Sequence, residues 1–147
     1  CAKELDSVLV FLRAAGRHLE AGIWTRIEKL RNILEKRLVE SVNKTIFVGK
    51  GGRRLANTSC FAVPGWKAET QVIQMDLAGF AVSAGSACSS GKVRASRVAL
   101  AMGYDAEVAG CAIRVSLGPA TTEAEILRFV AAWGAEFRKR SARAAPG

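Results

Sequence analysis

Apolar residues recur at helical spacing in the first third of the chain. The clearest stripe has intervals of four, three, four and four residues and consists of Ile23, Ile27, Leu30, Leu34 and Leu38. A stripe of this kind covers one face of an α-helix, so the pattern predicts a helix over residues 23–41. Thr25 and Glu28 have the spacing of a capping box near its start. A shorter stripe from Leu5 to Ala15 predicts another helix before it.

The rest of the chain alternates between short apolar runs and helical patterns, separated by glycine and proline. Strands are expected at 45–48, 55–63, 80–83 and 112–116. Helices are expected at 68–78 with Gly79 as its cap, at 95–102 closed by Gly103, and from the capping-box pair Thr122 and Glu125 onward. This alternation, without an internal repeat or linker, predicts an α/β fold. We expect a two-layer α+β sandwich with a small mixed or antiparallel sheet and helices on one face.

The composition is that of one folded domain. The chain has 147 residues, of which 50% are hydrophobic and 24% charged, values typical of a globular domain and not of a disordered chain. No apolar run approaches the roughly 20 residues of a membrane-spanning helix, and no leader peptide is expected. We therefore expect a cytoplasmic protein without a membrane partner. Residues 141–147 are small and basic and are expected to form a disordered tail.

The chain is strongly basic, with 22 Lys and Arg against 13 Asp and Glu and a formal net charge of +9. These residues are spread along the whole length, and aromatic residues make up only 7%. A nucleic-acid-binding surface usually concentrates its basic residues or interleaves them with aromatic rings. We therefore favour solvated helix faces and expect no nucleic-acid partner, with a surface for an anionic partner as the alternative.

The cysteine and histidine content argues against a metal site. Cys1, Cys60, Cys88 and Cys111 are far apart, and His18 is the only histidine. Structural zinc sites use closely paired ligands, so no metal is expected. A single histidine on a helix face also weakens any scheme that needs an imidazole base. Cys60 and Cys111 lie in apolar strand contexts and are expected to be inert core residues.

Residues 83–92 have the composition of an exposed loop. All of them except Cys88 and Lys92 are Ser, Gly or Ala, and such a segment cannot anchor itself in a core. We therefore expect a mobile surface loop with an exposed cysteine. Lys92 and Arg94 are near in sequence, and no acidic residue lies within ten positions of Cys88, which favours the thiolate. A small residue of a turn that happens to be cysteine fits the composition equally well.

Four motifs occur in an order that resembles one enzyme family. They are residues 55–58 (LANT), 79–91 (GFAVSAGSACSSG), 101–103 (AMG) and 113–118 (IRVSLG), the last followed by Thr121-Thr122-Glu123. Together they resemble cysteine desulfurases, the pyridoxal-phosphate enzymes that take sulfur from L-cysteine. The agreement is dense from about residue 55 to 133, while residues 1–50 agree in helix pattern only.

The resemblance implies roles for two residues. Cys88 matches the family's catalytic cysteine, whose thiolate attacks the substrate sulfur and keeps it as a persulfide. Arg114 matches the arginine that binds the substrate carboxylate. Independently, an arginine between Ile113 and Val115 is unusual in a strand unless its planar fork meets a carboxylate, although a structural ion pair is the alternative.

The activity implied by the resemblance is sulfur transfer from L-cysteine, with alanine as the other product. The sulfur would go to acceptor proteins such as an iron–sulfur scaffold, for iron–sulfur cluster assembly. The family also implies a homodimeric enzyme whose cofactor is pyridoxal 5'-phosphate.

The resemblance extends to the C-terminal small domain of these fold-type I enzymes, expected at residues 1–140. None of the eight lysines has the sequence context of the family's cofactor lysine, so the cofactor-binding large domain is expected to be missing. We therefore expect this chain alone to be inactive and not to bind pyridoxal phosphate covalently. Two other interpretations remain open: a stand-alone persulfide carrier that uses Cys88, and a basic interaction protein in which the loop is a relic.

Overall fold

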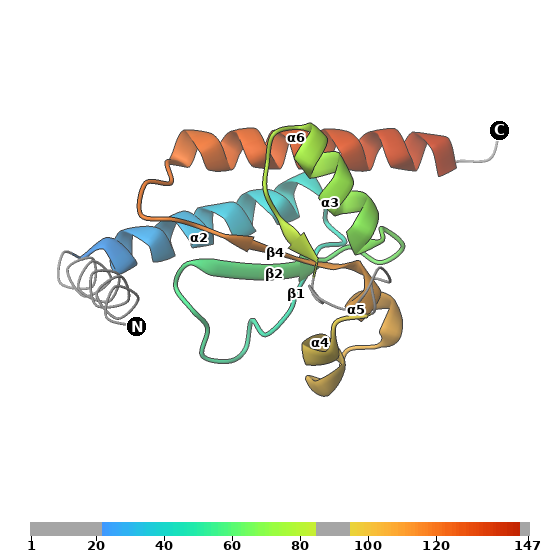
Figure 1. Cartoon of the computed structure of the whole chain (residues 1–147), viewed down its shortest axis with the longest axis horizontal. Helices are drawn as coiled ribbons and strands as arrows, with labels where there is room; N and C mark the ends of the chain where they lie inside the picture. Colours follow the sequence, from blue (N-terminus) through green and yellow to red (C-terminus); the bar gives the residue numbers. More distant parts are fainter. Residues whose placement is uncertain (1–21, 85–94, 145–147) are drawn as a thin grey trace, which may run out of the picture.

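A four-stranded antiparallel sheet forms the centre of the computed structural model, which describes residues 22–84 and 95–144 (Figure 1). The strands lie in the order β1-β2-β4-β3. Their bounds are β1 Ile46–Phe47, β2 Thr58–Ala62, β3 Ser83–Ala84 and β4 Ala112–Ser116. Of the two sheet types left open by the sequence, the antiparallel one is found, because every neighbouring pair in the sheet is antiparallel.

Three helices cover one face of this sheet, as predicted: α2 Ile23–Ser41, α3 Ala68–Leu77 and α6 Glu123–Ala144 (Figure 1). Their apolar faces and the inward residues of β2 and β4 form the main core. Trp133 stacks on Trp66 at a ring distance of 5.2 Å and meets the edge of Phe61 at 5.5 Å. Burial of such large rings supplies much of the hydrophobic stabilisation of a small domain.

Two short helices, α4 Arg97–Ala101 and α5 Ala106–Cys111, lie against one end of the opposite sheet face (Figure 1). The sequence does not predict α5. It begins at an N-cap, where the Asp105 carboxylate accepts a hydrogen bond from the Val108 N–H at 2.7 Å, the usual role of aspartate at this position. Because these helices are short, no helix within residues 22–84 and 95–144 covers the other end of this sheet face.

The predicted bounds of one helix and one strand agree fully with the structure. The helix over 23–41 and the strand over 112–116 are confirmed residue for residue. Thr122 and Glu125 form the predicted capping box of α6, each accepting a hydrogen bond from the other's backbone N–H. The capping box proposed for Thr25 is wrong, because α2 begins two residues earlier, after Gly22.

Other boundaries differ from the prediction. The strands expected at 45–48 and 55–63 are shorter and cover 46–47 and 58–62, and the helix expected at 95–102 covers 97–101. The strand expected at 80–83 begins only at Ser83, since Phe80 turns toward the helices and meets Phe129 edge-on at 5.5 Å. α6 extends to Ala144, four residues into the segment predicted as a disordered tail. Arg143 in its last turn interacts favourably with the helix dipole, which helps to explain the extension. The helix predicted over residues 5–15 lies outside the described residues.

Candidate functional site

Polar side chains lie on the sheet face opposite α2, α3 and α6, in the half that α4 and α5 do not cover. Successive residues of a strand point to opposite faces. The side chains that pack toward the helices are Ser59 and Phe61 of β2 and Ile113 and Val115 of β4. The residues between them therefore face away from the helices. On the open face these are Thr58 and Cys60 from β2, with Arg114 and Ser116 from β4. The sequence pattern therefore places a row of polar groups on the one face that α4 and α5 leave uncovered.

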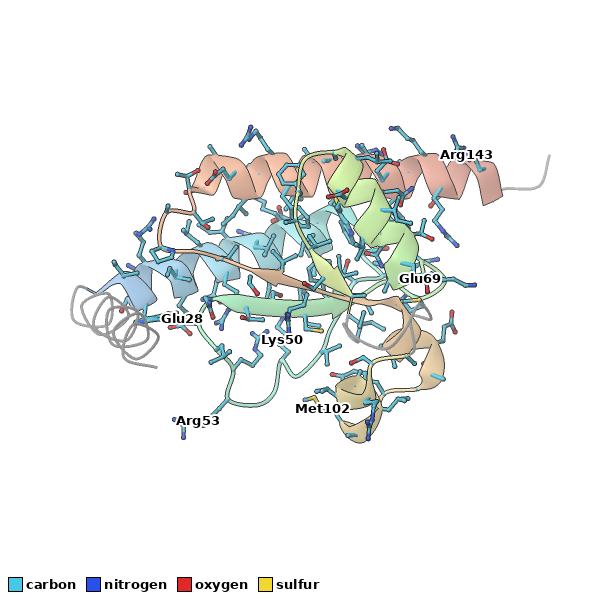
Figure 2. All side chains as sticks on the ribbon, in the orientation of Figure 1. Glu28, Lys50, Arg53, Glu69, Met102 and Arg143 are labelled. Atoms are coloured by element: carbon cyan, nitrogen blue, oxygen red, sulfur yellow. The ribbon has the colours of Figure 1, made fainter. Side chains whose placement is uncertain are left out.

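A groove of about 300 Å³ runs along this face. Its lining comes from the segment between β1 and β2, from the two central strands and from α4. The lining residues are Val48, Gly49, Gly52, Arg53, Arg54, Leu55, Thr58, Cys60, Ser96, Val98, Met102 and Arg114. Figure 2 shows Arg53 extending from the loop and Met102 on α4, both on the side of the sheet away from α6. The walls are apolar, the lining contains arginine, and none of these residues is acidic.

Arg114 is the predicted site residue that this groove contains. It is exposed, and its strand pairs with Cys60 on one side and with Ser83 on the other. In residues 22–84 and 95–144, no hydrogen bond or ion pair engages its guanidinium. The alternative of a structural ion pair therefore has no support in the described part of the chain. An unpaired guanidinium can offer two parallel N–H donors to a ligand carboxylate.

Cys60 lies beside Arg114 and is not the buried core residue that the sequence predicts, while the inertness of its thiol stays a prediction. Its side chain is only partly buried and lines the groove, because the strand alternation turns Ser59 and Phe61 inward and Cys60 outward. Burial raises the pKa of the Cys60 thiol, while the Arg114 guanidinium acts in the opposite direction to a smaller extent. The thiol is therefore protonated at neutral pH.

Cys111 is buried, as predicted. Burial raises the pKa of its thiol, and hydrogen bonds from the backbone of Gly65 and Trp66 offset part of that rise. Cys1, His18 and Cys88 lie outside the described residues. Of the loop predicted over residues 83–92, Ser83 and Ala84 instead form β3, and the remainder lies outside the described residues. The structure thus brings Arg114 and Cys60 together and leaves the position of Cys88 untested.

Sequence reasoning missed a buried ionic cluster that supports the loop beside the groove. Glu35 of α2 is buried and accepts hydrogen bonds from Arg54 and from the Ser59 hydroxyl, the latter at 2.8 Å. Arg31, one turn earlier, is also buried and donates to the Leu55 carbonyl at 2.9 Å. The sequence does contain a sign of this cluster. Arg31 and Glu35 each follow a residue of the apolar stripe, which places them at the edge of the helix face that is buried.

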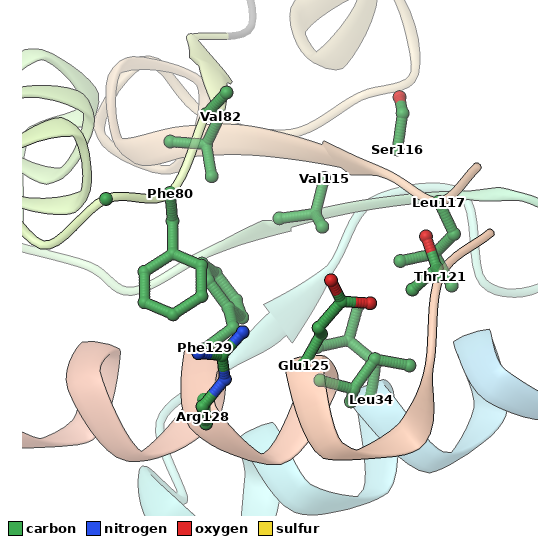
Figure 3. A pocket seen from close by; sticks show the side chains of 13 residues that line it. Leu34, Phe80, Val82, Val115, Ser116, Leu117, Thr121, Glu125, Arg128 and Phe129 are labelled. Carbon is green, nitrogen blue, oxygen red and sulfur yellow. The ribbon is translucent and has the colours of Figure 1, made fainter.

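A second hollow of about 220 Å³ lies on the helix side, between α6, the end of β4 and residues 79–82 (Figure 3). Glu125 and Arg128 project from α6 toward it, and Phe80 faces Phe129. Hydrogen bonds from Thr122 lower the pKa of Glu125, and Arg128 contributes in the same direction. Since Glu125 is already engaged by the helix cap, this hollow is a weaker candidate for a ligand site than the groove beside Arg114.

The groove does not fit pyridoxal phosphate by itself. None of its lining residues is a lysine that could form an imine with the aldehyde, and none is an acid that could face the pyridine nitrogen. In the described ranges, no three His, Cys, Asp or Glu side chains lie close enough together to hold a metal ion. None of the helices described here is long and apolar enough to span a bilayer.

Comparisons with known proteins agree with the fold and the motifs. Residues 7–129 match the family model of class-V aminotransferases. A cysteine desulfurase of Cereibacter sphaeroides is 40% identical over 104 residues, which are 71% of this chain and 27% of that protein. Cysteine desulfurase NifS of Azotobacter vinelandii is 34% identical over 106 residues, 72% of this chain and 26% of that protein. The chain thus spans about a quarter of the length of these relatives.

A solved structure shows the same arrangement of elements. The X-ray structure of a NifS-like protein from Rickettsia africae superposes with a TM-score of 0.67 at 30% sequence identity. The match covers 78% of this chain and 29% of that one. The small antiparallel sheet with its helices is therefore a part of a larger fold in that neighbour.

Proposed function

Because this chain belongs to the class-V aminotransferase family, we propose that it is the part of a cysteine desulfurase that binds the substrate carboxylate and accepts the sulfur. The observation that carries the proposal is the Arg114 guanidinium, which no residue of 22–84 or 95–144 engages, in a groove whose described lining contains no acidic residue. The order of the motifs around Cys88 and the names of the relatives, which are cysteine desulfurases, support the same reaction class.

In this proposal Arg114 holds L-cysteine by its carboxylate. Two parallel N–H···O bonds fix both the position and the direction of the substrate. Leu55, Val98 and Met102 line the groove beside Arg114 but are themselves exposed. The selectivity of this contact therefore comes from its paired N–H···O geometry and not from the exclusion of water.

Cys88 is the proposed acceptor of the sulfur. Its thiolate forms an S–S bond with the substrate sulfur while the C–S bond breaks, so that Cys88 becomes a persulfide. The electron pair of the broken bond stays with the carbon skeleton, which takes up a proton and leaves as alanine. Lys92 and Arg94, close in sequence, would favour the reactive thiolate.

Pyridoxal phosphate supplies, when bound, the sink for the electrons released at the substrate carbon. Because the groove lacks the groups to hold it, we place its binding residues in the remainder of the full-length protein. We also propose that this protein is a homodimer that hands the sulfur to an iron–sulfur scaffold. The support is the resemblance and the likeness to the NifS-type relative.

The test is the Arg114→Lys substitution in the full-length protein. Lysine keeps the charge but cannot form the two-pronged contact, a loss of about 1.5–3 kcal/mol. The KM for L-cysteine should therefore rise by about tenfold or more, while the cofactor spectrum stays unchanged. Arg143→Lys, at an exposed position near the end of α6, is the control for the exchange of arginine for lysine. An unchanged KM would contradict the role of Arg114.

A further inference from the structure

Cys60 and Arg114 face each other directly across strands β2 and β4. The Cys60 carbonyl accepts the Val48 N–H at 2.8 Å, so the backbone of Cys60 bonds toward β1 and not toward β4. Cys60 and Arg114 therefore form a non-hydrogen-bonded pair, the kind in which opposing side chains approach most closely. Both side chains line the groove, and the charge of Arg114 is felt at the Cys60 sulfur.

Glu35, the acid that contacts β2 through Ser59, is already engaged. Glu35 lies on the helix side, where it binds Arg54 and the hydroxyl of Ser59, the residue just before Cys60. The groove itself has no carboxylate in its lining. Position 60 lies directly opposite Arg114, so a negative charge there would be close to its guanidinium.

The other groups around Cys60 do not supply such a charge. The charged side chains of the groove are the arginines Arg53, Arg54 and Arg114, and α4 contributes the neutral Ser96, Val98 and Met102. Tyr104 packs nearby, and its hydroxyl is bonded to the backbone of Phe47 and Gly49. Among the described residues that line the groove, the Cys60 thiol is therefore the group whose ionisation would give Arg114 an anionic neighbour.

We propose that Cys60 is a positioning residue of the carboxylate site: its neutral thiol leaves the Arg114 guanidinium free for the substrate, and its thiolate competes with the substrate for that guanidinium. This inference rests on the proposed role of Arg114. A protonated thiol is a weak hydrogen-bond donor and acceptor, so it does not hold the guanidinium. A thiolate would form an ion pair across the strands.

Steady-state kinetics of the full-length protein with L-cysteine tests this inference. Cys60→Asp puts a permanent negative charge opposite Arg114. The KM at neutral pH should rise about tenfold, the effect of losing a charge-assisted hydrogen bond, with a much smaller change in kcat. Cys60→Asn, of the same shape but neutral, should have a KM several times lower than Cys60→Asp. Thr70→Asp, on the exposed face of α3, controls for the added charge.

The pH profile gives a second, independent readout. In the wild-type protein the KM should rise with pH as the Cys60 thiol ionises. In Cys60→Val, which has no ionisable group there, that rise should be reduced or lost on the same pH series. If the role of Cys60 is merely structural, the KM of Cys60→Val differs from the wild-type KM by the same factor at every pH. This comparison decides the question even where Cys60→Asp fails to fold.

The outcomes separate the inference from the proposed function. If Arg114→Ala leaves the KM unchanged, the carboxylate role of Arg114 is wrong, and the inference falls with it. A second case is that Arg114→Ala raises the KM, as the proposed function requires. If Cys60→Asp and Cys60→Asn then have the same KM, and Cys60→Val keeps the wild-type pH profile, the inference alone is overturned. If the inference is correct, Cys60→Asp adds little to the KM in the Arg114→Ala background, because the two substitutions act on one contact.

Discussion

Arg54 donates two hydrogen bonds to the Glu35 carboxylate, from Nη1 to Oε1 at 2.6 Å and from Nη2 to Oε2 at 3.2 Å. This contact joins α2 to the segment that leads into β2 and forms one wall of the groove. Glu35 is buried, so its charge depends on Arg54 and on Ser59 for compensation. The loop beside Arg114 is therefore fixed by an ionic contact on the far side of the sheet.

Removing the charge of Glu35 should destabilise the domain strongly. Glu35→Gln leaves Arg54 without its anion in a partly buried site, and we expect the free energy of unfolding to fall by about 3 kcal/mol. Glu40→Gln is the matched control, because Glu40 pairs with Arg37 on the surface of the same helix and such pairs contribute at most about 1 kcal/mol. Urea unfolding measures both. Equal effects of the two substitutions would contradict this account.

Gln71 should be a second position of high sensitivity. It is fully buried, donates to the carbonyls of Trp66 and Cys111, and accepts the indole N–H of Trp133 at 3.0 Å. Gln71→Leu leaves these groups without partners, at a cost of about 2–4 kcal/mol in unfolding free energy. Gln74→Leu on the same helix should cost less, because Gln74 is only partly buried and water can replace it. Thermal unfolding of the two variants tests this ranking.

The capping box of α6 should give a measurable pH effect. Hydrogen bonds from the Thr122 backbone N–H and hydroxyl lower the pKa of Glu125. Its contribution to stability is therefore present above its ordinary value of about 4.3 and is lost as the pH falls through the lowered value. Thr122→Ala should raise the pKa of Glu125 toward the ordinary value, as followed by NMR of the carboxyl carbon. Thr121→Val, which removes a hydroxyl not bonded to Glu125, should leave the titration in place.

At alkaline pH the two described thiols should weaken the fold. Burial raises the pKa of both Cys60 and Cys111. The folded state therefore holds these protons more tightly than the unfolded state. The stabilisation that these protons contribute is fully present below the ordinary thiol pKa of about 8.5. It declines as the pH rises above that and through the raised pKa values of the folded state.

Urea unfolding at several pH values above 8 should show this decline. Cys111→Ala should reduce the slope relative to the wild-type protein, even though it lowers stability overall. A slope that is unchanged when both thiols are replaced would show that other groups cause the decline.

Some features of this fold are encoded by short stretches of the sequence alone. The stripe from Ile27 to Leu38 and the run Ala112–Ser116 are set by their own periodicity, and both were predicted to the residue. Arg114 was singled out because it matches the carboxylate-binding arginine of the family that the sequence resembles, and because an arginine between Ile113 and Val115 is unusual in a strand. These features need no knowledge of distant residues.

Other features depend on contacts that a linear pattern does not contain. Cys60 was assigned to the core because its neighbours are apolar, but the position of α4 and α5 decides which half of that face is open. The start of β3 depends on the contact of Phe80 with Phe129, a residue 49 positions later. The ion pair of Glu35 with Arg54 likewise joins residues that are 19 positions apart.

The most direct test of the proposed function locates the transferred sulfur atom. The full-length protein is incubated with L-cysteine, alkylated, digested and analysed by mass spectrometry. We predict one additional sulfur atom on the peptide that contains Cys88, none on those that contain Cys60 or Cys111, and a strong reduction at low substrate concentration in the Arg114→Ala variant. An additional sulfur on Cys60 or Cys111, or alanine formation with no additional sulfur on Cys88, would contradict the proposal.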